Sequence, residues 1–463
     1  MSFEPIGAIT IGLGLLCLLL GRHATVLGFV VFCTLGSAAA ILIGGANVPP
    51  AHLFLVFLLV ATLCWRKLLV NAVTSLKTSE PGFWLLCLVT YGILSSYILP
   101  RLFAGSTFIV PLGSSDHLAT LDGIVPLGPV SSNLTQPIYL LGDLACFVTI
   151  MAVGSTQRGF ATITTALIAY AFVNLCFGAL DLLTSATGTQ DALQIIRNAQ
   201  YTFHDEESVG DMRRIIGSWP EASAFASMTL TAFAFTATMW LYGRRSLTTG
   251  AIALMSLLFV VLSTSSTGLA GAAVMLVVLY AIALTRCGTQ REYWNASAIV
   301  VFAPLLVAVI GLYVISEAHI FARIYDYVDT LILSKSTTSS GLQRSYWNEV
   351  ALGNFLDTFG LGVGLGTNRT SSFPLALLSN IGVPGLLFYL VFIAMVFGSR
   401  RGMPRTFAAD VRGAARVACF SALTAGILAG PTVDQGLLFY VFAGLACAAP
   451  ERERATDGAP ALR

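Results

Sequence analysis

The run ALLSNIGVPGLLFYLVFIAMVF, residues 376–397, contains no charged residue and exceeds the roughly 20 residues that a helix needs to cross a bilayer. Backbone groups inside hydrocarbon must bond to one another, so such a run predicts a transmembrane helix. The whole chain shares this character: of its 463 residues, 56% are hydrophobic and 10% are charged. A soluble domain has roughly 25% charged residues, so the composition excludes a water-soluble globular fold.

Similar apolar runs recur along the chain. They fall near 5–20, 25–44, 51–70, 83–100, 136–153, 160–183, 222–242, 248–263, 267–285, 296–315, 376–397, 412–429 and 433–449. The first could be a signal-peptide core, but it lacks a basic segment before it and an Ala-x-Ala site after it, so we count it as a membrane helix. We therefore predict an all-α, polytopic membrane protein with about thirteen transmembrane helices. They form one domain, residues 1–454, followed by a disordered tail, 455–463.

Lysine and arginine occupy alternate connections between these runs. The basic connections contain Arg66 with Lys67, Arg158, Arg244 with Arg245, Arg286 with Arg291, and Arg400, Arg401 and Arg405. Because cytoplasmic connections keep an excess of Lys and Arg, this parity predicts that they and the tail are cytoplasmic. It puts three long loops, 101–135, 185–221 and 316–372, on the periplasmic side of a bacterial inner membrane. Loops of that length are uncommon unless functional or disordered, so any chemistry is expected there.

Short helices are predicted within the third loop. Apolar residues recur at helical spacing from Ile320 to Leu331, which is typical of a helix lying flat on a membrane surface. The sequence Ser340 to Gln343 fits a capping box and predicts a second helix, from just before Arg344 to about Asp357. The glycine-rich stretch 360–367 then ends it. No GK[ST] follows, so this stretch does not indicate a nucleotide-binding loop.

Charge and cysteine content exclude several classes of function. The net charge is +2, which gives no bulk field to recruit nucleic acid. The nine cysteines lie almost entirely within apolar runs, so neither a disulfide framework nor a zinc site is indicated. We expect no metal and no cofactor.

The most unusual segment, residues 211–226, ends the second loop. It holds Arg213, Arg214, Trp219 and Glu221 against the predicted start of a membrane helix. Glu221 is either a helix-start carboxylate favoured by the helix dipole or a catalytic base whose pKa is tuned at the bilayer edge. The two arginines either contact lipid phosphates or bind a substrate, since the positive-inside bias disfavours arginine on this side.

Further arginines lie in the other two long loops, at Arg101, Arg344 and Arg369. A guanidinium group binds phosphate oxygens bidentately and keeps its charge at any pH, so a converging set would suit a diphosphate. Ion pairs with loop carboxylates are the alternative. Trp219 and Tyr346 would either stack on sugar rings or anchor the chain at the headgroups.

Other polar residues also have two interpretations. Ser371 and Ser372, with the glycines before them, would offer donors to a ligand or form a tight re-entrant turn. His204 lies in an acidic run and is expected to be a solvated surface residue, because no second histidine stands at a ligand spacing. Asp143 and Asp181 fall within or beside apolar helices, where an ionisable group marks either a function or a satisfied packing contact.

Four segments resemble the O-antigen ligase and Wzy-type repeat-unit polymerase superfamily, and within it the exopolysaccharide polymerase-like branch. They are Leu99–Phe103, Arg214–Ser223, Leu262–Gly268, and Gly362–Phe373 with Gly382–Gly385. Their order and the topology match over most of the chain. O-antigen ligases carry a histidine where this chain has Thr370, so its absence favours the polymerase branch. Many family members also carry arginine where this chain has Ser266.

The resemblance implies a membrane glycosyltransferase that polymerises undecaprenyl-diphosphate-linked oligosaccharide repeat units into exopolysaccharide at the periplasmic face. In our hypothesis Arg214 and Arg344, with Arg369 or Arg101, hold the diphosphate while Glu221 takes the proton of a sugar hydroxyl. Its partners would be lipid-linked donor and acceptor, membrane lipid, a flippase, and chain-length or export proteins. The alternatives are a ligase that transfers glycan to another acceptor and a flippase or transporter, although we find no internal repeat.

Overall fold

The computed structural model describes residues 2–43, 46–199, 208–209, 212–288, 294–331, 338–399, 401–451 and 453. Its α-helices are α1 (Pro5–Leu20), α2 (Arg22–Phe32), α3 (Pro50–Leu63), α4 (Arg66–Thr74), α5 (Pro81–Leu102), α6 (Ser132–Gly154), α7 (Gln157–Thr187), α8 (Ala222–Leu241), α9 (Ser246–Leu262), α10 (Ser266–Arg286), α11 (Trp294–Ser316), α12 (Ala318–Leu331), α13 (Ser339–Asp357), α14 (Phe373–Gly398), α15 (Phe407–Ala429) and α16 (Leu437–Cys447). A 3-10 helix, η1, spans Gln190–Ile196. Short antiparallel strands pair as β1 (Ser2–Phe3) with β2 (Ile41–Ile43) and β3 (Ala46–Val48), β4 (Phe108–Ile109) with β5 (Val125–Pro126), and β6 (Ser208–Val209) with β7 (Met212–Arg213).

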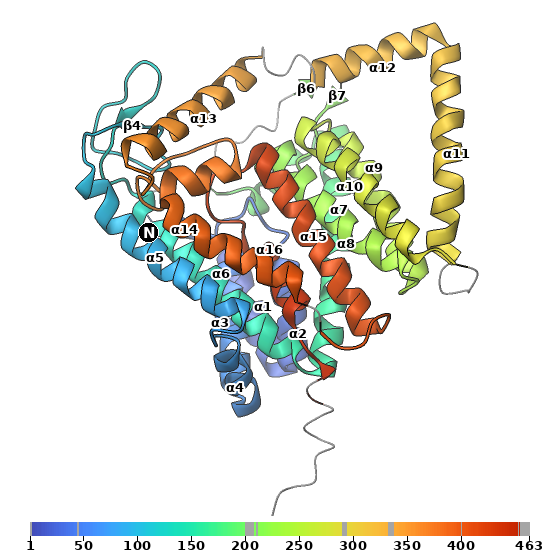
Figure 1. Ribbon diagram of the computed structural model, residues 1–463, viewed down its shortest axis with the longest axis horizontal. Helices are drawn as coiled ribbons and strands as arrows, with labels where there is room; N and C mark the ends of the chain where they lie inside the picture. Colours follow the sequence, from blue (N-terminus) through green and yellow to red (C-terminus); the bar gives the residue numbers. More distant parts are fainter. Residues whose placement is uncertain are drawn as a thin grey trace, which may run out of the picture.

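The helices form a bundle around α16, which is buried along its whole length and lies against α6 and α15. At the periphery, α11 is apolar, and its membrane-spanning stretch is not buried by the rest of the protein. Figure 1 shows α11 at the right edge, away from most of the bundle, with α12 running back from its far end. A helix that is apolar all round and exposed needs lipid rather than water as its surroundings. The structure is therefore that of a membrane-spanning protein.

Eight of the described helices are long and apolar enough to cross a membrane, and there are nine if α3 and α4 count as one bent span. The helices α1, α2, α9 and α16 are apolar but shorter. Each apolar run identified in the sequence contains one of these helices. The all-α membrane fold is confirmed, whereas the count of about thirteen spans stays a prediction.

Besides the run 376–397, whose helix α14 is kinked at Gly382, two of the runs are not single straight helices. In the run 25–44, α2 ends at Phe32 because the following backbone bonds to other segments: Ser37 N–H donates to Ser218 O at 2.9 Å, and Ala40 N–H to Val48 O at 2.8 Å. The run 51–70 bends by 110° between α3 and α4. Two basic residues open α4, and charges are costly in hydrocarbon. One continuous helix is the wrong prediction for both runs.

The basic connections meet at one end of the bundle. Lys67 forms an ion pair with Glu453 at 3.0 Å, and Arg244 and Arg286 both bind Asp410, at 2.8 and 3.0 Å. In Figure 1 this end, with α4, is at the bottom, and β4, α12 and α13 are at the top. The bundle therefore has one basic end and one end that carries the long loops.

The first and third long loops pack against each other at that second end. Pro111 pairs with Asn368 in an isolated β-bridge, and the backbone N–H of Arg369 donates to Val110 O at 2.8 Å. The helices predicted in the third loop are present as α12 and α13, and α13 ends at Asp357 as expected. It begins earlier than predicted, because the Thr338 hydroxyl, not that of Ser340, caps it by accepting the Gly341 N–H at 3.2 Å.

Candidate functional site

Glu221 stands at the start of α8, as the sequence predicts. It is the N-cap residue, with extended backbone (φ −152°, ψ 161°), and its side chain caps no backbone N–H group of the helix. Its carboxylate accepts a hydrogen bond from the Ser223 hydroxyl instead and is half-buried. The unbonded N–H groups of the first turn and the helix dipole favour negative charge at this position. Glu221 thus lies at the start of the helix, and its carboxylate is not used to cap the backbone N–H groups.

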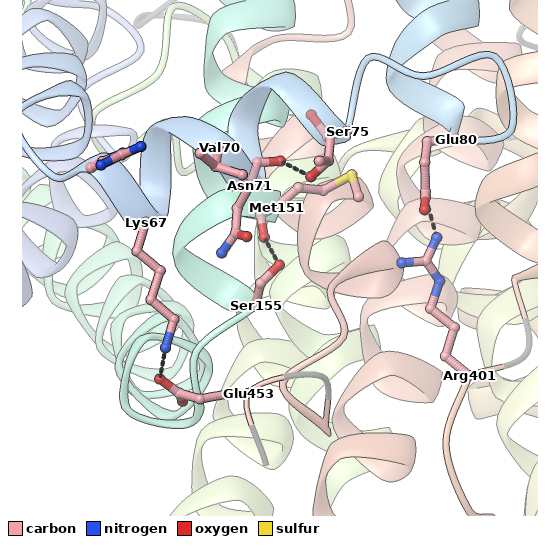
Figure 2. Close-up of a pocket in the computed structure, with 11 residues that line it drawn as sticks. Lys67, Val70, Asn71, Ser75, Glu80, Met151, Ser155, Arg401 and Glu453 are labelled. Atoms are coloured by element: carbon pink, nitrogen blue, oxygen red, sulfur yellow. Dashed lines mark hydrogen bonds and ion pairs between the residues drawn. The ribbon is translucent and has the colours of Figure 1, made fainter. Parts of the chain in front are cut away.

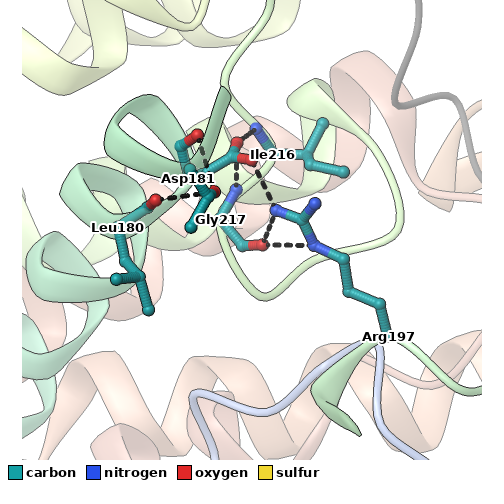
Figure 3. A network of polar contacts seen from close by, with 6 residues as sticks. Leu180, Asp181, Arg197, Ile216 and Gly217 are labelled. Atoms are coloured by element: carbon teal, nitrogen blue, oxygen red, sulfur yellow. Dashed lines mark hydrogen bonds and ion pairs between the residues drawn. The ribbon is translucent and has the colours of Figure 1, made fainter. Parts of the chain in front are cut away.

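An ion pair fixes the segment that leads to Glu221 (Figure 3). Asp181 in α7 accepts hydrogen bonds from the backbone N–H groups of Ile216 and Gly217, at 2.9 and 3.1 Å. Its other oxygen binds the Arg197 guanidinium at 2.7 Å, and Arg197 also donates to the Gly217 carbonyl at 2.9 Å through Nε. Both side chains are at least nine-tenths buried. Of the two interpretations of Asp181, the structure favours the satisfied packing contact.

The next two residues are held by different elements. Ser218 Oγ donates to Thr34 O at 2.6 Å, and the Trp219 indole N–H donates to Asn174 Oδ1 at 2.9 Å. Trp219 is only 8% exposed, and its ring lies so close to Gly36 that a Cβ there would come within 2.2 Å. A ring buried in this way is not open to a sugar. The structure gives Trp219 a packing role and not the sugar-stacking role considered from the sequence.

The glycine-rich stretch after α13 folds into a tight, internally bonded turn. Gly360, Gly362, Gly364 and Gly366 all have positive φ, from 79° to 101°. The backbone N–H groups of Val363 and Gly364 donate to the carbonyl groups of residues 379 and 380, and those of residues 367 and 368 donate to Asn380 Oδ1. These N–H groups are therefore not available to a ligand. The tight re-entrant turn is the interpretation that the structure favours.

Gly382, which faces this turn from α14, should not tolerate a side chain. Its backbone (φ 57°, ψ −161°) is in a region that essentially only glycine adopts, and a Cβ would lie 2.3 Å from Gly360 O. We expect Gly382→Ala to lower the free energy of unfolding by about 1–3 kcal/mol or more, measured by denaturation in detergent. Gly353→Ala is the matched control, because its Cβ would meet nothing within 4 Å on α13. A stable Gly382→Ala protein would contradict this prediction.

Arg369 comes within electrostatic reach of both Glu221 and Arg344, which lie on two other segments. Arg344 is half-buried on α13, and the Arg369 guanidinium lies over the Trp347 ring, 4.7 Å from its centroid. Arg369 keeps an exposed surface, yet the surrounding chain displaces enough of its water to lower the pKa of the guanidinium. The Glu221 carboxylate raises that pKa, and the positive charge of Arg344 lowers it. Arg369 therefore has one carboxylate and one further cation near it.

Loop residues beside Arg369 complete this region. The side chain of Asn348 on α13 accepts the Ser371 N–H at 2.9 Å, and the Ser372 hydroxyl donates to Ile427 O at 3.1 Å. Ser371 is buried, whereas Ser372 and Tyr346 are half-buried. These bonds tie α13 and the start of α14 to α15. The Ser372 hydroxyl holds the loop against α15, and part of the Tyr346 side chain is exposed.

The remaining candidates are not shown to join this group. Arg101 is exposed and donates to the carbonyl of Tyr97 in its own helix at 2.7 Å. Arg214 is half-buried, seven residues before Glu221 on the anchored segment. The side chain of Arg213 and the whole of His204 lie outside the described residues. Their expected roles stay predictions.

Trp347 was missed from the sequence, although a usable signal was present. Residues three apart on a helix share a face, so a helix through Arg344 puts Trp347 beside it. The aromatic face attracts a guanidinium group, and in the structure that group belongs to Arg369. The ring therefore positions one of the two arginines of the site.

Asp143 in α6 lies in the core behind this region. It is fully buried, and its carboxyl oxygens accept no hydrogen bond from an N–H or O–H donor in the described part of the chain. Its side chain interacts with the carboxyl group of Asp434, in the loop before α16. The same loop touches the site, because the Thr370 N–H donates to Pro431 O at 3.3 Å.

Comparison with known proteins does not indicate a function for this site. No protein-family model matches the chain, and no curated protein matches its sequence. Among the described residues, no three side chains of the metal-binding types lie together. The groups at this site that can take part in a reaction are its two arginines and its carboxylate.

Proposed function

We propose that this chain is a membrane glycosyltransferase that polymerises polyprenyl-diphosphate-linked oligosaccharide repeat units. The observation that carries the proposal is that Glu221 and Arg344 both lie within electrostatic reach of Arg369, on segments at the end opposite the basic connections. Two guanidinium groups and the start of α8 offer positive potential for a diphosphate, and a carboxylate beside them can accept a proton. The four sequence segments that resemble the Wzy-type superfamily also support it, since two of them supply Glu221 and Arg369.

The reaction is a single displacement at the anomeric carbon of the donor. The acceptor hydroxyl oxygen attacks that carbon, the bond to the diphosphate oxygen breaks, and the configuration inverts. The leaving diphosphate takes the bonding electrons, and Arg344 and Arg369 stabilise its charge. Glu221 accepts the hydroxyl proton and releases it to water afterwards. Neither an oxidant nor a nucleotide is needed, because the lipid diphosphate supplies the free energy.

We further propose that the chain spans a bacterial inner membrane about thirteen times, with this site at the periplasmic face. The positive-inside rule supports that orientation, since the basic connections share the opposite end. In this proposal Arg214 contacts the diphosphate less directly than Arg344 and Arg369 do. It lies on the same anchored segment as Glu221. Tyr346, with its half-exposed ring, is the aromatic side chain open to a sugar.

The test uses the full chain in lipid vesicles with a labelled lipid-diphosphate-linked oligosaccharide. We expect products that grow by whole repeat units. Arg344→Ala and Arg369→Ala should each reduce the rate by about 10²-fold, because each removes a group that stabilises the leaving diphosphate. Arg323→Ala is the matched control, since Arg323 is an exposed arginine of the same loop on α12. Equal loss in all three variants, or no loss in any, would overturn the assignment.

The same vesicles distinguish the alternatives. A label that crosses the bilayer unchanged identifies a flippase or transporter, and a glycan moved once, without growth, to a different acceptor identifies a ligase. The gathered carboxylate favours an enzyme over a carrier, because a carrier needs charge complementarity but no proton acceptor beside the diphosphate.

A further inference from the structure

A cavity of about 590 Å³, lined by both charged and apolar side chains, opens at the basic end of the bundle, far from the site described above (Figure 2). It lies between α4, the end of α6, the start of α5 and the connection between α14 and α15. Its charged and amide-bearing lining residues are Arg66, Lys67, Asn71, Glu80, Arg401 and Glu453. Three cations face two carboxylates, so the lining carries an excess of one positive charge.

Two of the cations are already neutralised by ion pairs. Lys67 binds Glu453 at 3.0 Å, and Arg401 binds Glu80, which is largely buried. Hydrogen bonds from the Gln157 backbone N–H and from Lys67 hold the pKa of Glu453 below its usual value, so this carboxylate is charged at neutral pH. The excess charge of the cavity therefore resides on Arg66.

Arg66 and Asn71 offer hydrogen-bond donors that the protein does not use. Arg66 is exposed and bonds to no acceptor in the part of the chain that the structure describes. Asn71 is half-buried, and its side-chain amide likewise has no partner there. In Figure 2 the Asn71 amide lies between the two ion pairs. Both residues line the cavity, so both can contact one anion bound in it.

The helix that carries these donors has the character of a helix at a membrane surface. It bends 110° from α3 and buries Leu68 while exposing Val70 and Val73, at 52% and 61%. Trp65, just before it, is 56% exposed, and its ring stacks under the guanidinium of Arg22 at 4.9 Å. Amphipathic helices with a tryptophan and basic residues at one end lie at the level of the lipid headgroups. The cavity mouth is then at headgroup level.

We infer that this cavity binds the phosphate-bearing head group of an anionic phospholipid from the leaflet at the basic end. Arg66 and Asn71 donate to the phosphate oxygens, and Val70, which also lines the cavity, contacts the upper acyl chain. A soluble phosphate has the same anionic chemistry but no apolar part to cover the exposed face of α4. The bound lipid would stabilise the angle between α3 and α4, and it takes no part in the proposed transfer reaction.

The test measures lipid retention by the purified full chain in detergent, using native mass spectrometry. Phosphatidylglycerol is titrated against phosphatidylcholine, and inorganic phosphate and glycerol phosphate are added as soluble competitors. We expect phosphatidylglycerol to be retained in preference to phosphatidylcholine. Arg66→Ala should weaken its binding about fivefold, as one lost basic contact near an anionic lipid predicts. Asn71→Leu should weaken it as well, and Arg66→Lys should keep part of the binding.

Lys77→Ala is the matched control, because Lys77 is an exposed lysine just beyond α4 that does not line the cavity. Its retention of phosphatidylglycerol should equal that of the unaltered protein. Equal binding of the two lipids, or equal effects of Arg66→Ala and Lys77→Ala, would overturn the inference. Displacement of the lipid by glycerol phosphate at equal concentration would also overturn it, because the cavity would then be a site for a soluble anion.

Discussion

Glu221→Gln should reduce glycan elongation about 10²- to 10⁴-fold, while leaving the donor bound. Glutamine has the same shape and keeps an oxygen for the Ser223 hydroxyl, but it cannot accept the proton of the attacking sugar. The change removes a negative charge near Arg369, so the affinity for the diphosphate should rise or stay the same. The rate of repeat-unit addition and the Kd for the lipid-linked donor are the two measurements.

Two control variants separate this role from a structural one. Ser223→Ala removes only the hydrogen bond to Glu221 and should slow elongation far less than Glu221→Gln. Glu349→Gln changes an exposed glutamate on α13 and should have no effect. If Glu221→Gln elongates glycan at the normal rate, Glu221 is only a helix-start carboxylate, and the proposed base must be sought elsewhere.

Asp181→Ala should destabilise the protein by about 3–5 kcal/mol, the usual cost of leaving one half of a buried ion pair without its partner. The change leaves the Arg197 charge buried and removes the acceptor of the Ile216 and Gly217 N–H groups. Arg197→Met should cost less, because Asp181 would retain its two backbone donors. Denaturation of the purified protein in detergent gives the free energy of unfolding.

Asp191→Ala provides the comparison for this prediction. Asp191 is an exposed aspartate of η1 that bonds only the side chain of Gln194, at 2.8 Å, among the contacts that the structure describes. Its replacement should change the stability by no more than about 0.5 kcal/mol. Because the Asp181 contacts hold the segment that ends at Glu221, Asp181→Ala should also reduce elongation in the protein that stays folded. Equal stability of both aspartate variants would contradict the anchoring role of Asp181.

Residue types in the sequence indicate the chemical character of the site, but they do not indicate which residues belong to it. Arginines in outer loops and a carboxylate after Pro220 are visible in the sequence. Contacts among these residues depend on how loops far apart in the chain pack together. The periodicity of apolar residues does not predict that packing. Trp219 illustrates the limit: an aromatic residue next to a catalytic candidate resembles a ligand contact, yet contacts with Gly36 in the turn after α2 and with Asn174 in α7 bury it.

The sequence by itself determined the helices, because hydrophobicity and backbone hydrogen bonding act locally: every long apolar run contains a helix, α13 ends at Asp357, and α8 begins after Glu221. Only the tertiary structure decided where α2 stops, since its backbone groups find partners in other segments. It also decided that Arg369 lies within electrostatic reach of both Glu221 and Arg344. Local sequence sets each helix, whereas long-range contacts set which side chains share a site.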